Sequence, residues 1–93
     1  MKILISNKAK LELYLHSFYK SKYSKASAHK FFKDFNSSIQ SLLLFPYMYP
    51  KISTKSPYRK ILFNKKYLII YFIENDTIYI DSIINCKQNY IDS

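Results

Sequence analysis

Residues 58–84, YRKILFNKKYLIIYFIENDTIYIDSII, decide the fold of this chain. Apolar and polar side chains alternate towards both ends of the stretch, whereas its middle is apolar at every position. Alternation is typical of a strand with one buried face, and an unbroken apolar run is typical of a strand buried on both faces. Two short polar breaks separate the runs. The stretch therefore predicts three antiparallel strands, at 58–64, 67–73 and 77–86.

The alternation also predicts which side chains face the core. Ile61 and Phe63 share one face of the first strand, and the polar breaks at 65–66 and 74–76 turn the chain. In the last strand one set of side chains is expected to point inward, namely Ile78, Ile80 and Ile84. The alternate set is expected to point away from the core, namely Tyr79, Asp81 and Asn85.

The sequence before this stretch predicts a strand followed by a helix. Residues 2–6 alternate and are mostly apolar, which indicates a short first strand, and Ser6 or Asn7 can cap the helix that follows. Apolar residues then recur with spacings of three and four positions, which marks one apolar helical face through about residue 22. The residues of this face are Leu11, Tyr14, Leu15 and Phe18.

A second helix follows a tight connection at 23–24, and Pro46 ends it because proline disfavours helical geometry in the preceding residue. Its apolar stripe consists of Ala28, Phe31, Phe32, Phe35, Ile39, Leu42 and Leu43. Two helices joined so closely pack as an antiparallel hairpin, and the proline-containing residues 45–57 form an extended loop. We therefore predict a single α+β domain over residues 1–93, of order β-α-α-β-β-β. The helical hairpin covers one face of a mainly antiparallel four-stranded sheet.

The chain is strongly basic. Its 93 residues include 15 Lys and Arg against 6 Asp and Glu, a formal net charge of +9. No acidic residue occurs between Phe35 and Ile73, so we expect the basic residues of this stretch to lie at one edge of the sheet and bind nucleic acid or an acidic partner. They are Lys51, Lys55, Arg59, Lys60, Lys65 and Lys66. A second group on the helices is interspersed with Glu12 and Asp34 and is typical of a solvated surface: Lys8, Lys20, Lys22, Lys25, Lys30 and Lys33.

The composition excludes several classes of protein. Cys86 is the only cysteine, so an intramolecular disulfide and a cysteine-based metal cluster are impossible, and there is no glycine for a phosphate-cradling loop. The longest apolar run, 67–73, is far too short to span a bilayer, and the apolar start is too short for a signal peptide. We therefore expect a cytosolic protein with no membrane partner and no metal or organic cofactor.

Four segments together carry a family resemblance. They are ILISNKAKLEL (3–13), ASAHKFFKDFNSSIQSLLLFPYMYP (26–50), SPYRKILFNKKYLIIYFIENDTIYIDSII (56–84) and NCKQNY (85–90). In this order and spacing they resemble the RelE/ParE superfamily of bacterial type II toxins. The first resembles its opening strand and helix start, the second its helix ending in "FP", and the third its arginine-bearing strand, acidic turn and last strand. The resemblance covers nearly the whole chain.

This resemblance implies a growth-inhibiting toxin that is held silent by a co-expressed acidic antitoxin wrapped around its helical hairpin and sheet. A net charge of +9 on the toxin suits such a partner, because complementary charge speeds association. RelE-like members of the superfamily cut messenger RNA on the ribosome, whereas ParE-like members are not nucleases and block DNA gyrase. The implied target is therefore either DNA gyrase or the ribosome with its mRNA.

RNA cleavage by 2′-hydroxyl attack needs a proton acceptor, a proton donor and cations on the phosphate. The resemblance supplies five candidates for these roles: Lys51, Lys55, Arg59, Lys87 and Tyr90. Lys87 stands in place of the family's arginine and lacks the bidentate grip of a guanidinium on phosphate. Asn85 stands where members often have histidine. These departures favour the ParE-like, non-enzymatic class over a RelE-like metal-independent endoribonuclease.

Two further expectations concern the remaining polar and aromatic residues. His16 and His29 lie on the predicted helices, and neither has a carboxylate or cysteine at a spacing that would form a catalytic pair. We therefore expect both histidines to be polar residues on the helix surface. Most Tyr and Phe side chains are expected on core faces, which argues against base stacking. A small basic nucleic-acid-binding protein with no toxin role is the third alternative.

Overall fold

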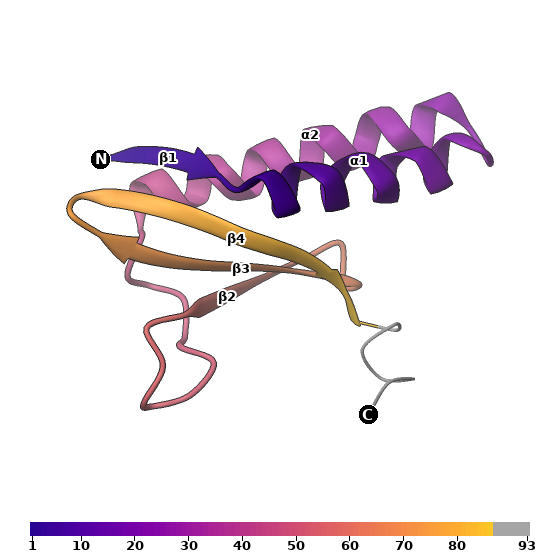
Figure 1. The fold of residues 1–93 in the computed structure, drawn as a ribbon. Coiled ribbons are helices and arrows are strands. Elements are labelled where there is room, and N and C mark those ends of the chain that lie inside the picture. The colour runs from indigo at the N-terminus through magenta and orange to yellow at the C-terminus, as the bar shows by residue number, and fades with distance from the viewer. Residues whose placement is uncertain (87–93) are drawn as a thin grey trace.

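The computed structural model describes residues 1–86 and has the predicted α+β architecture (Figure 1). In chain order its elements are β1 (Lys2–Ile5), α1 (Asn7–Ser21), α2 (Lys25–Leu44), β2 (Arg59–Phe63), β3 (Tyr67–Glu74) and β4 (Thr77–Asn85). The strands form one sheet in the order β1-β4-β3-β2. The β1–β4 pair is parallel, and the other two pairs are antiparallel. The mainly antiparallel sheet, with both helices on one face, confirms the predicted fold class.

Side-chain caps define where the two helices begin. Ser6 precedes α1 in an extended conformation, and its Oγ accepts a hydrogen bond of 2.9 Å from the backbone N–H of Ala9. Ser24 does the same for α2, accepting from the N–H of Ser27 at 2.9 Å. Each cap satisfies one of the N–H groups that the first helical turn leaves without a partner. The cap predicted at Ser6 or Asn7 is therefore Ser6.

The two β-hairpins turn without glycine. Asn64, Lys65, Asn75 and Asp76 all have positive φ, between 50° and 60°. Asn and Asp tolerate this left-handed conformation better than other residues with a Cβ atom, whereas lysine does not share that advantage. Lys65 is therefore the one of the four whose backbone conformation its side chain does not favour.

The core lies between α2 and the inner face of the sheet. Phe31, Phe35 and Leu42 of α2 are at most 3% exposed and pack against the strands. Phe31 makes the main aromatic contacts, with ring centroids 5.5 Å from Phe63 and 5.0 Å from Tyr67. Full burial of a side chain of this size contributes roughly 2–3 kcal/mol. The apolar stripe predicted for the second helix is thus confirmed at Phe31, Phe35, Ile39 and Leu42. It is wrong at Phe32 and Leu43, which are 38% and 39% exposed.

Helix α1 docks on β4 through small and polar side chains. Ala9 and Ser17 are its buried residues. The Glu12 carboxylate accepts a 2.9 Å hydrogen bond from the backbone N–H of Ile83, and Nε2 of His16 lies 3.2 Å from the carbonyl of the same residue and donates to it. The His16 ring also packs 5.1 Å from Tyr67. The expectation that His16 is a surface residue is therefore wrong, because its carbonyl partner on β4 is distant in sequence.

The predicted apolar face of α1 points to solvent. Leu11, Tyr14, Leu15 and Phe18 are between 45% and 64% exposed. The periodicity identified a helix correctly, but the face that meets the sheet is the polar one, held by Glu12 and the other groups just described. Seven Tyr and Phe residues within 1–86 are exposed, so the expectation that most aromatic side chains lie on core faces is too broad. They are Tyr14, Phe18, Tyr19, Tyr23, Phe32, Phe45 and Tyr47.

A β-bulge at Asp81 changes the inward set of β4. Tyr71 pairs with Ile80, whereas the preceding Ile70 pairs with Ser82, so Asp81 is the additional residue. Its carbonyl accepts a 2.8 Å hydrogen bond from Ser6 Oγ, which ties the bulge to the start of α1. After Asp81, the alternation of inward-facing and outward-facing side chains along β4 is reversed.

This reversal overturns two predictions for the last strand. Ile83 is fully buried, and Ile84, which pairs with the half-buried Leu68, lies on the other face. Asn85 pairs with the buried Tyr67 and therefore lies on the inner face. The predictions that Ile84 faces inward and Asn85 faces away are both wrong, because an alternating pattern does not reveal a one-residue bulge.

Neither helix within residues 1–86 is long and apolar enough to cross a bilayer. The same residues contain no group of three or more His, Cys, Asp or Glu side chains that could hold a metal ion.

Candidate functional site

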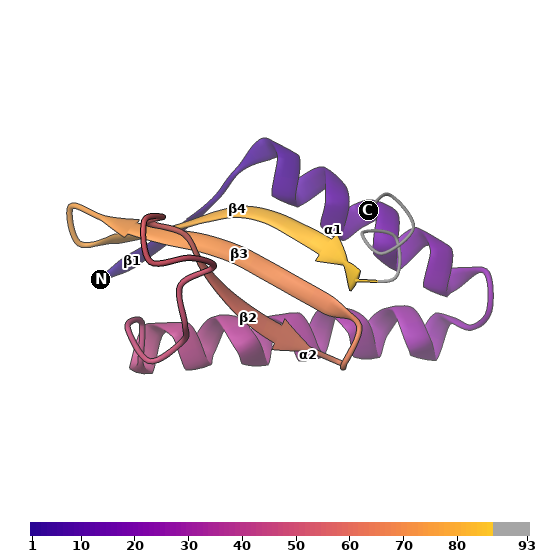
Figure 2. The same cartoon turned by 90° about the horizontal axis from the view of Figure 1, so that it is seen from below.

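The proline-containing loop between α2 and β2 is attached to the end of the sheet. The Tyr71 hydroxyl donates a 2.9 Å hydrogen bond to the carbonyl of Pro46, and the Ser41 and Tyr49 hydroxyls form a short hydrogen bond with each other. Backbone bonds from Lys60 to Pro50 (3.1 Å) and from Ile52 to Tyr58 (3.0 Å) continue the sheet briefly into the loop. Seen from below in Figure 2, the loop lies across one end of the sheet. It is therefore a fixed part of the fold.

Arg59 is the residue that holds this loop. Its Nη1 donates to the carbonyl of Tyr49 at 2.6 Å and to that of Tyr47 at 3.3 Å. The guanidinium carbon also lies 5.5 Å from the centroid of the Tyr47 ring, a cation–π contact. Arg59 is half-buried at the start of β2. These contacts use the guanidinium to bridge two backbone carbonyls of this chain.

Lys51 is the predicted site residue that lies beside Arg59. The two residues face each other across an isolated antiparallel bridge, and both line a small hollow of about 190 Å³. Lys55 and Lys60 are exposed, and neither is among the residues lining that hollow. The structure therefore brings together two of the four predicted cations at this end of the sheet.

Lys65 and Lys66 lie at the opposite end of β2 (Figure 2). Since a strand rises about 3.3 Å per residue, the five residues of β2 separate the two basic groups by roughly 16 Å. The predicted basic edge thus follows the edge strand β2 but divides into two sites. The second site includes lysines from the helices, which the sequence had indicated only as a solvated group.

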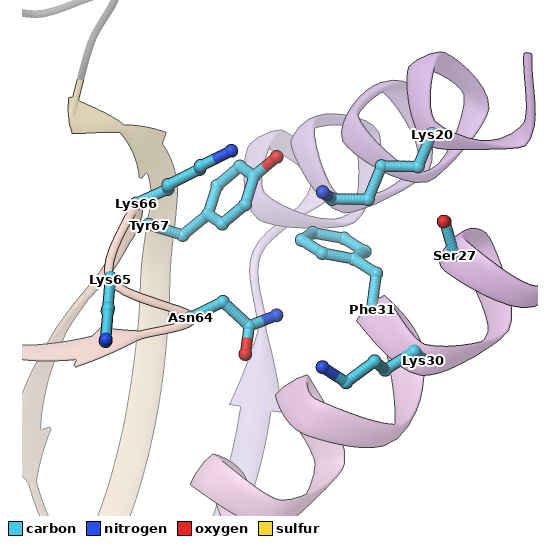
Figure 3. Close-up of a pocket in the computed structure, with 8 residues that line it drawn as sticks. All are labelled: Lys20, Ser27, Lys30, Phe31, Asn64, Lys65, Lys66 and Tyr67. Carbon is cyan, nitrogen blue, oxygen red and sulfur yellow. The ribbon is translucent and has the colours of Figure 1, made fainter. Parts of the chain in front are cut away.

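This second site is a hollow of about 470 Å³ between the two helices and the β2–β3 turn (Figure 3). We call it the lysine pocket. It is lined by Lys20, Ser27, Lys30, Phe31, Asn64, Lys65, Lys66 and Tyr67. The sequence spacing of these residues gives no sign that they meet, because three separate elements supply them. A signal was nevertheless present, since the sequence contains very few carboxylates to neutralise the lysines of either group.

Proton-transfer groups are scarce around Arg59. Burial is the main cause that raises the pKa of the nearby Tyr71 to about 12, and the charge of Arg59 only partly opposes it. The phenol therefore keeps its proton at neutral pH and donates a hydrogen bond to the Pro46 carbonyl. His16 is hydrogen-bonded to the Ile83 carbonyl of β4, and His29 lies on the exposed surface of α2. The candidates Lys87 and Tyr90 lie outside the described residues. What the described residues offer here is positive charge.

Comparisons with known proteins agree with this fold. A family model described as the ParE toxin of the type II toxin–antitoxin system, parDE, matches residues 3–90. No curated protein matches the chain significantly. Eleven chains of solved structures do, among them one from the chromosomal ParDE TA system of P. aeruginosa. It superposes with a TM-score of 0.79 at 15% sequence identity, covering 91% of this chain and 95% of that one.

Proposed function

The chain belongs to the ParE toxin family of type II toxin–antitoxin systems, and on this premise we propose that it arrests growth by binding DNA gyrase. The observation that carries the proposal is the family match itself, which covers residues 3–90 and is to ParE. Among the toxins that the sequence resembles, the ParE-like class is the one directed against gyrase.

The geometry at Arg59 supports a non-nuclease. An arginine that assists RNA cleavage must present its guanidinium to a phosphate as negative charge develops. Here Nη1 is 2.6 Å from the Tyr49 carbonyl, and the guanidinium packs on the Tyr47 ring. The neighbouring phenol of Tyr71 has a pKa of about 12, which is poorly matched to proton transfer near neutral pH. The alternative, ribosome-dependent mRNA cleavage, is therefore not favoured.

The experiment is pulse-labelling of DNA, RNA and protein synthesis within minutes of inducing the chain alone. We expect DNA synthesis to fall first, and purified protein to inhibit supercoiling by purified gyrase. An Arg59→Lys variant, which keeps the positive charge, serves as a comparison for the role of the guanidinium. If protein synthesis falls first and mRNA is cut, the gyrase proposal is wrong and the nuclease alternative replaces it.

A ParDE system includes an antitoxin, which is the partner of this toxin. We propose further that this partner is acidic and covers the apolar face of α1. Leu11, Tyr14, Leu15 and Phe18 are about half exposed there, which is unusual for a contiguous apolar surface unless a partner covers it. A groove of about 290 Å³ between α1 and β4 lies beside this face. An amphipathic acidic helix would bury the apolar side chains and oppose the positive charge.

The antitoxin surface is tested by titrating the purified toxin with the antitoxin of its own system. Tyr14→Glu places a repelling charge on the exposed face, and we expect at least tenfold weaker binding. Lys55→Gln lowers the net charge by the same one unit but lies away from α1, so it serves as the matched control. Equal weakening by both variants would mean that net charge, and not this face, determines the affinity.

A further inference from the structure

The lysine pocket combines dense positive charge with a lack of neutralising groups. Lys20 comes from α1, Lys30 from α2, and Lys65 and Lys66 from the β2–β3 turn. Among the described residues, no carboxylate lines the pocket. Within residues 1–86 the one salt bridge joins the N-terminal ammonium to Asp76, so none of these lysines is paired. Four like charges around one hollow repel one another, and an anion that enters it removes that repulsion.

Three of the four lysines extend into the same space. In Figure 3, Lys20, Lys30 and Lys66 extend towards the region in front of Phe31 and Tyr67, whereas Lys65 points away. The Lys20 ammonium lies 5.8 Å from the centroid of Phe31 and 5.5 Å from that of Tyr67. These cation–π contacts orient Lys20 over the aromatic floor before any ligand is bound. Part of the ordering that a ligand would otherwise impose is therefore already present.

The aromatic floor is a support and not a stacking surface. Phe31 is 1% exposed and Tyr67 is 5% exposed, so a base cannot lie on either ring. The groups left to contact a ligand are the ammonium groups, the Asn64 amide and the Ser27 hydroxyl. These are hydrogen-bond donors suited to a compact, multiply charged group with several oxygens. Phosphoryl groups have this character, and lysine binds them as a point charge.

We propose that the lysine pocket is a binding site for phosphoryl groups, centred on Lys20, Lys30 and Lys66. The phosphates come from a nucleotide or from a nucleic-acid backbone, which share this chemistry. The hollow of about 470 Å³ is within the range of pockets that accept ligands of nucleotide size. The site is separate from Arg59 and independent of the gyrase proposal, so either can fail while the other stands.

The test measures binding of two probes, magnesium-free ATP and a 20-base-pair DNA duplex, to the full-length protein by calorimetry. The pocket variant Lys20→Gln/Lys30→Gln/Lys66→Gln is compared with a control variant that removes the same charge elsewhere, Lys8→Gln/Lys33→Gln/Lys55→Gln. We expect the pocket variant to weaken binding at least about tenfold, since charge-assisted hydrogen bonds are lost, and the control to weaken it less than threefold.

The same titrations measure the salt dependence of the affinity and identify the molecule that supplies the phosphate. For the duplex, the slope of log K against log salt should fall by about one for each pocket lysine that contacts a phosphate. Tight binding of the duplex with none of ATP identifies the backbone as the source, and tight binding of ATP identifies a nucleotide. Thermal unfolding provides a second measurement, because a ligand that binds the pocket raises the Tm of the wild type but not of the pocket variant.

Three results would overturn the proposal. The first is that neither probe binds at 0.15 M salt, and the second is that both triple variants lose affinity equally. The third is that a polyglutamate peptide binds the pocket while both phosphate probes fail, which would assign the site to an acidic protein segment.

Discussion

Replacing Arg59 by alanine tests whether this residue is a structural anchor. The 2.6 Å bond to the Tyr49 carbonyl is charge-assisted and part-buried, and bonds of this kind contribute about 1.5 kcal/mol or somewhat more. The 3.3 Å bond to Tyr47 is exposed, and with the cation–π contact it adds roughly 0.5–1 kcal/mol. We therefore expect Arg59→Ala to lower the free energy of unfolding by about 2 kcal/mol, which is roughly 10 °C in Tm for a domain of this size.

Urea unfolding followed by circular dichroism measures the loss, and amide hydrogen exchange locates it. Exchange should accelerate at Ile52 and Lys60, whose N–H groups pair across the base of the loop, and should change little in β4. Arg59→Lys keeps the charge but cannot span two carbonyls in the same way, so about half of the loss should remain. An alanine variant within 0.5 kcal/mol of wild type would refute the anchor, and Arg59 would again be available to contact a phosphate.

Three further predictions address the phenol beneath the loop, the strained turn and the exposed helix. Burial raises the pKa of Tyr71 to about 12, whereas an unfolded tyrosine titrates near 10, so the folded state holds this proton more tightly. Stability from this group is complete below pH 10 and is lost between about pH 10 and 12. When the free energy of unfolding is measured between pH 10 and 12, Tyr71→Phe should reduce its decrease with pH by up to about 3 kcal/mol. An unchanged pH dependence in this variant would contradict the raised pKa of Tyr71. Lys65→Gly removes the Cβ atom from a residue with φ of 60°, and thermal unfolding should show a gain of up to about 1 kcal/mol. The same change at Lys66, which is not among the residues with positive φ, should give no gain. Phe18→Ser on the exposed face of α1 should change stability by less than about 1 kcal/mol yet weaken antitoxin binding in calorimetric titration; a large loss of stability would mean that Phe18 is part of the core.

The regular part of the fold was predictable because each element carries its own local signal. Alternation, a continuous apolar run and the Ser6 cap placed the strands and helices within a residue or two of their observed bounds. The errors arose where one residue or one face depended on a distant partner. At the bulge the Asp81 carbonyl accepts a hydrogen bond from Ser6, and the inward polar face of α1 is held by the bonds of Glu12 and His16 to Ile83. Neither bond can be read from local periodicity.

The candidate site was predictable in its chemistry but not in its geometry. The charge count indicated correctly that the loop and hairpin are basic. It could not show that the Arg59 guanidinium donates its hydrogen bonds to carbonyls of the adjacent loop. Nor could it show that Lys20 and Lys30, separated from Lys66 by some forty residues of sequence, line the same hollow. Lysines on different elements meet only once the helices and the hairpin are packed.

The pairing of β1 with β4 has a consequence for how the toxin is made. Lys2 lies opposite Thr77 and Ile5 opposite Ile80, so the first strand of the chain finds its neighbour 75 positions later. During translation β1 emerges first and remains unpaired until β4 is available. Closing so long a loop costs conformational entropy, and only the pairing with β4 offsets that cost. The nascent chain therefore cannot complete its sheet until nearly all of it has left the ribosome. The toxin fold is thus completed only after β4, residues Thr77–Asn85, has emerged.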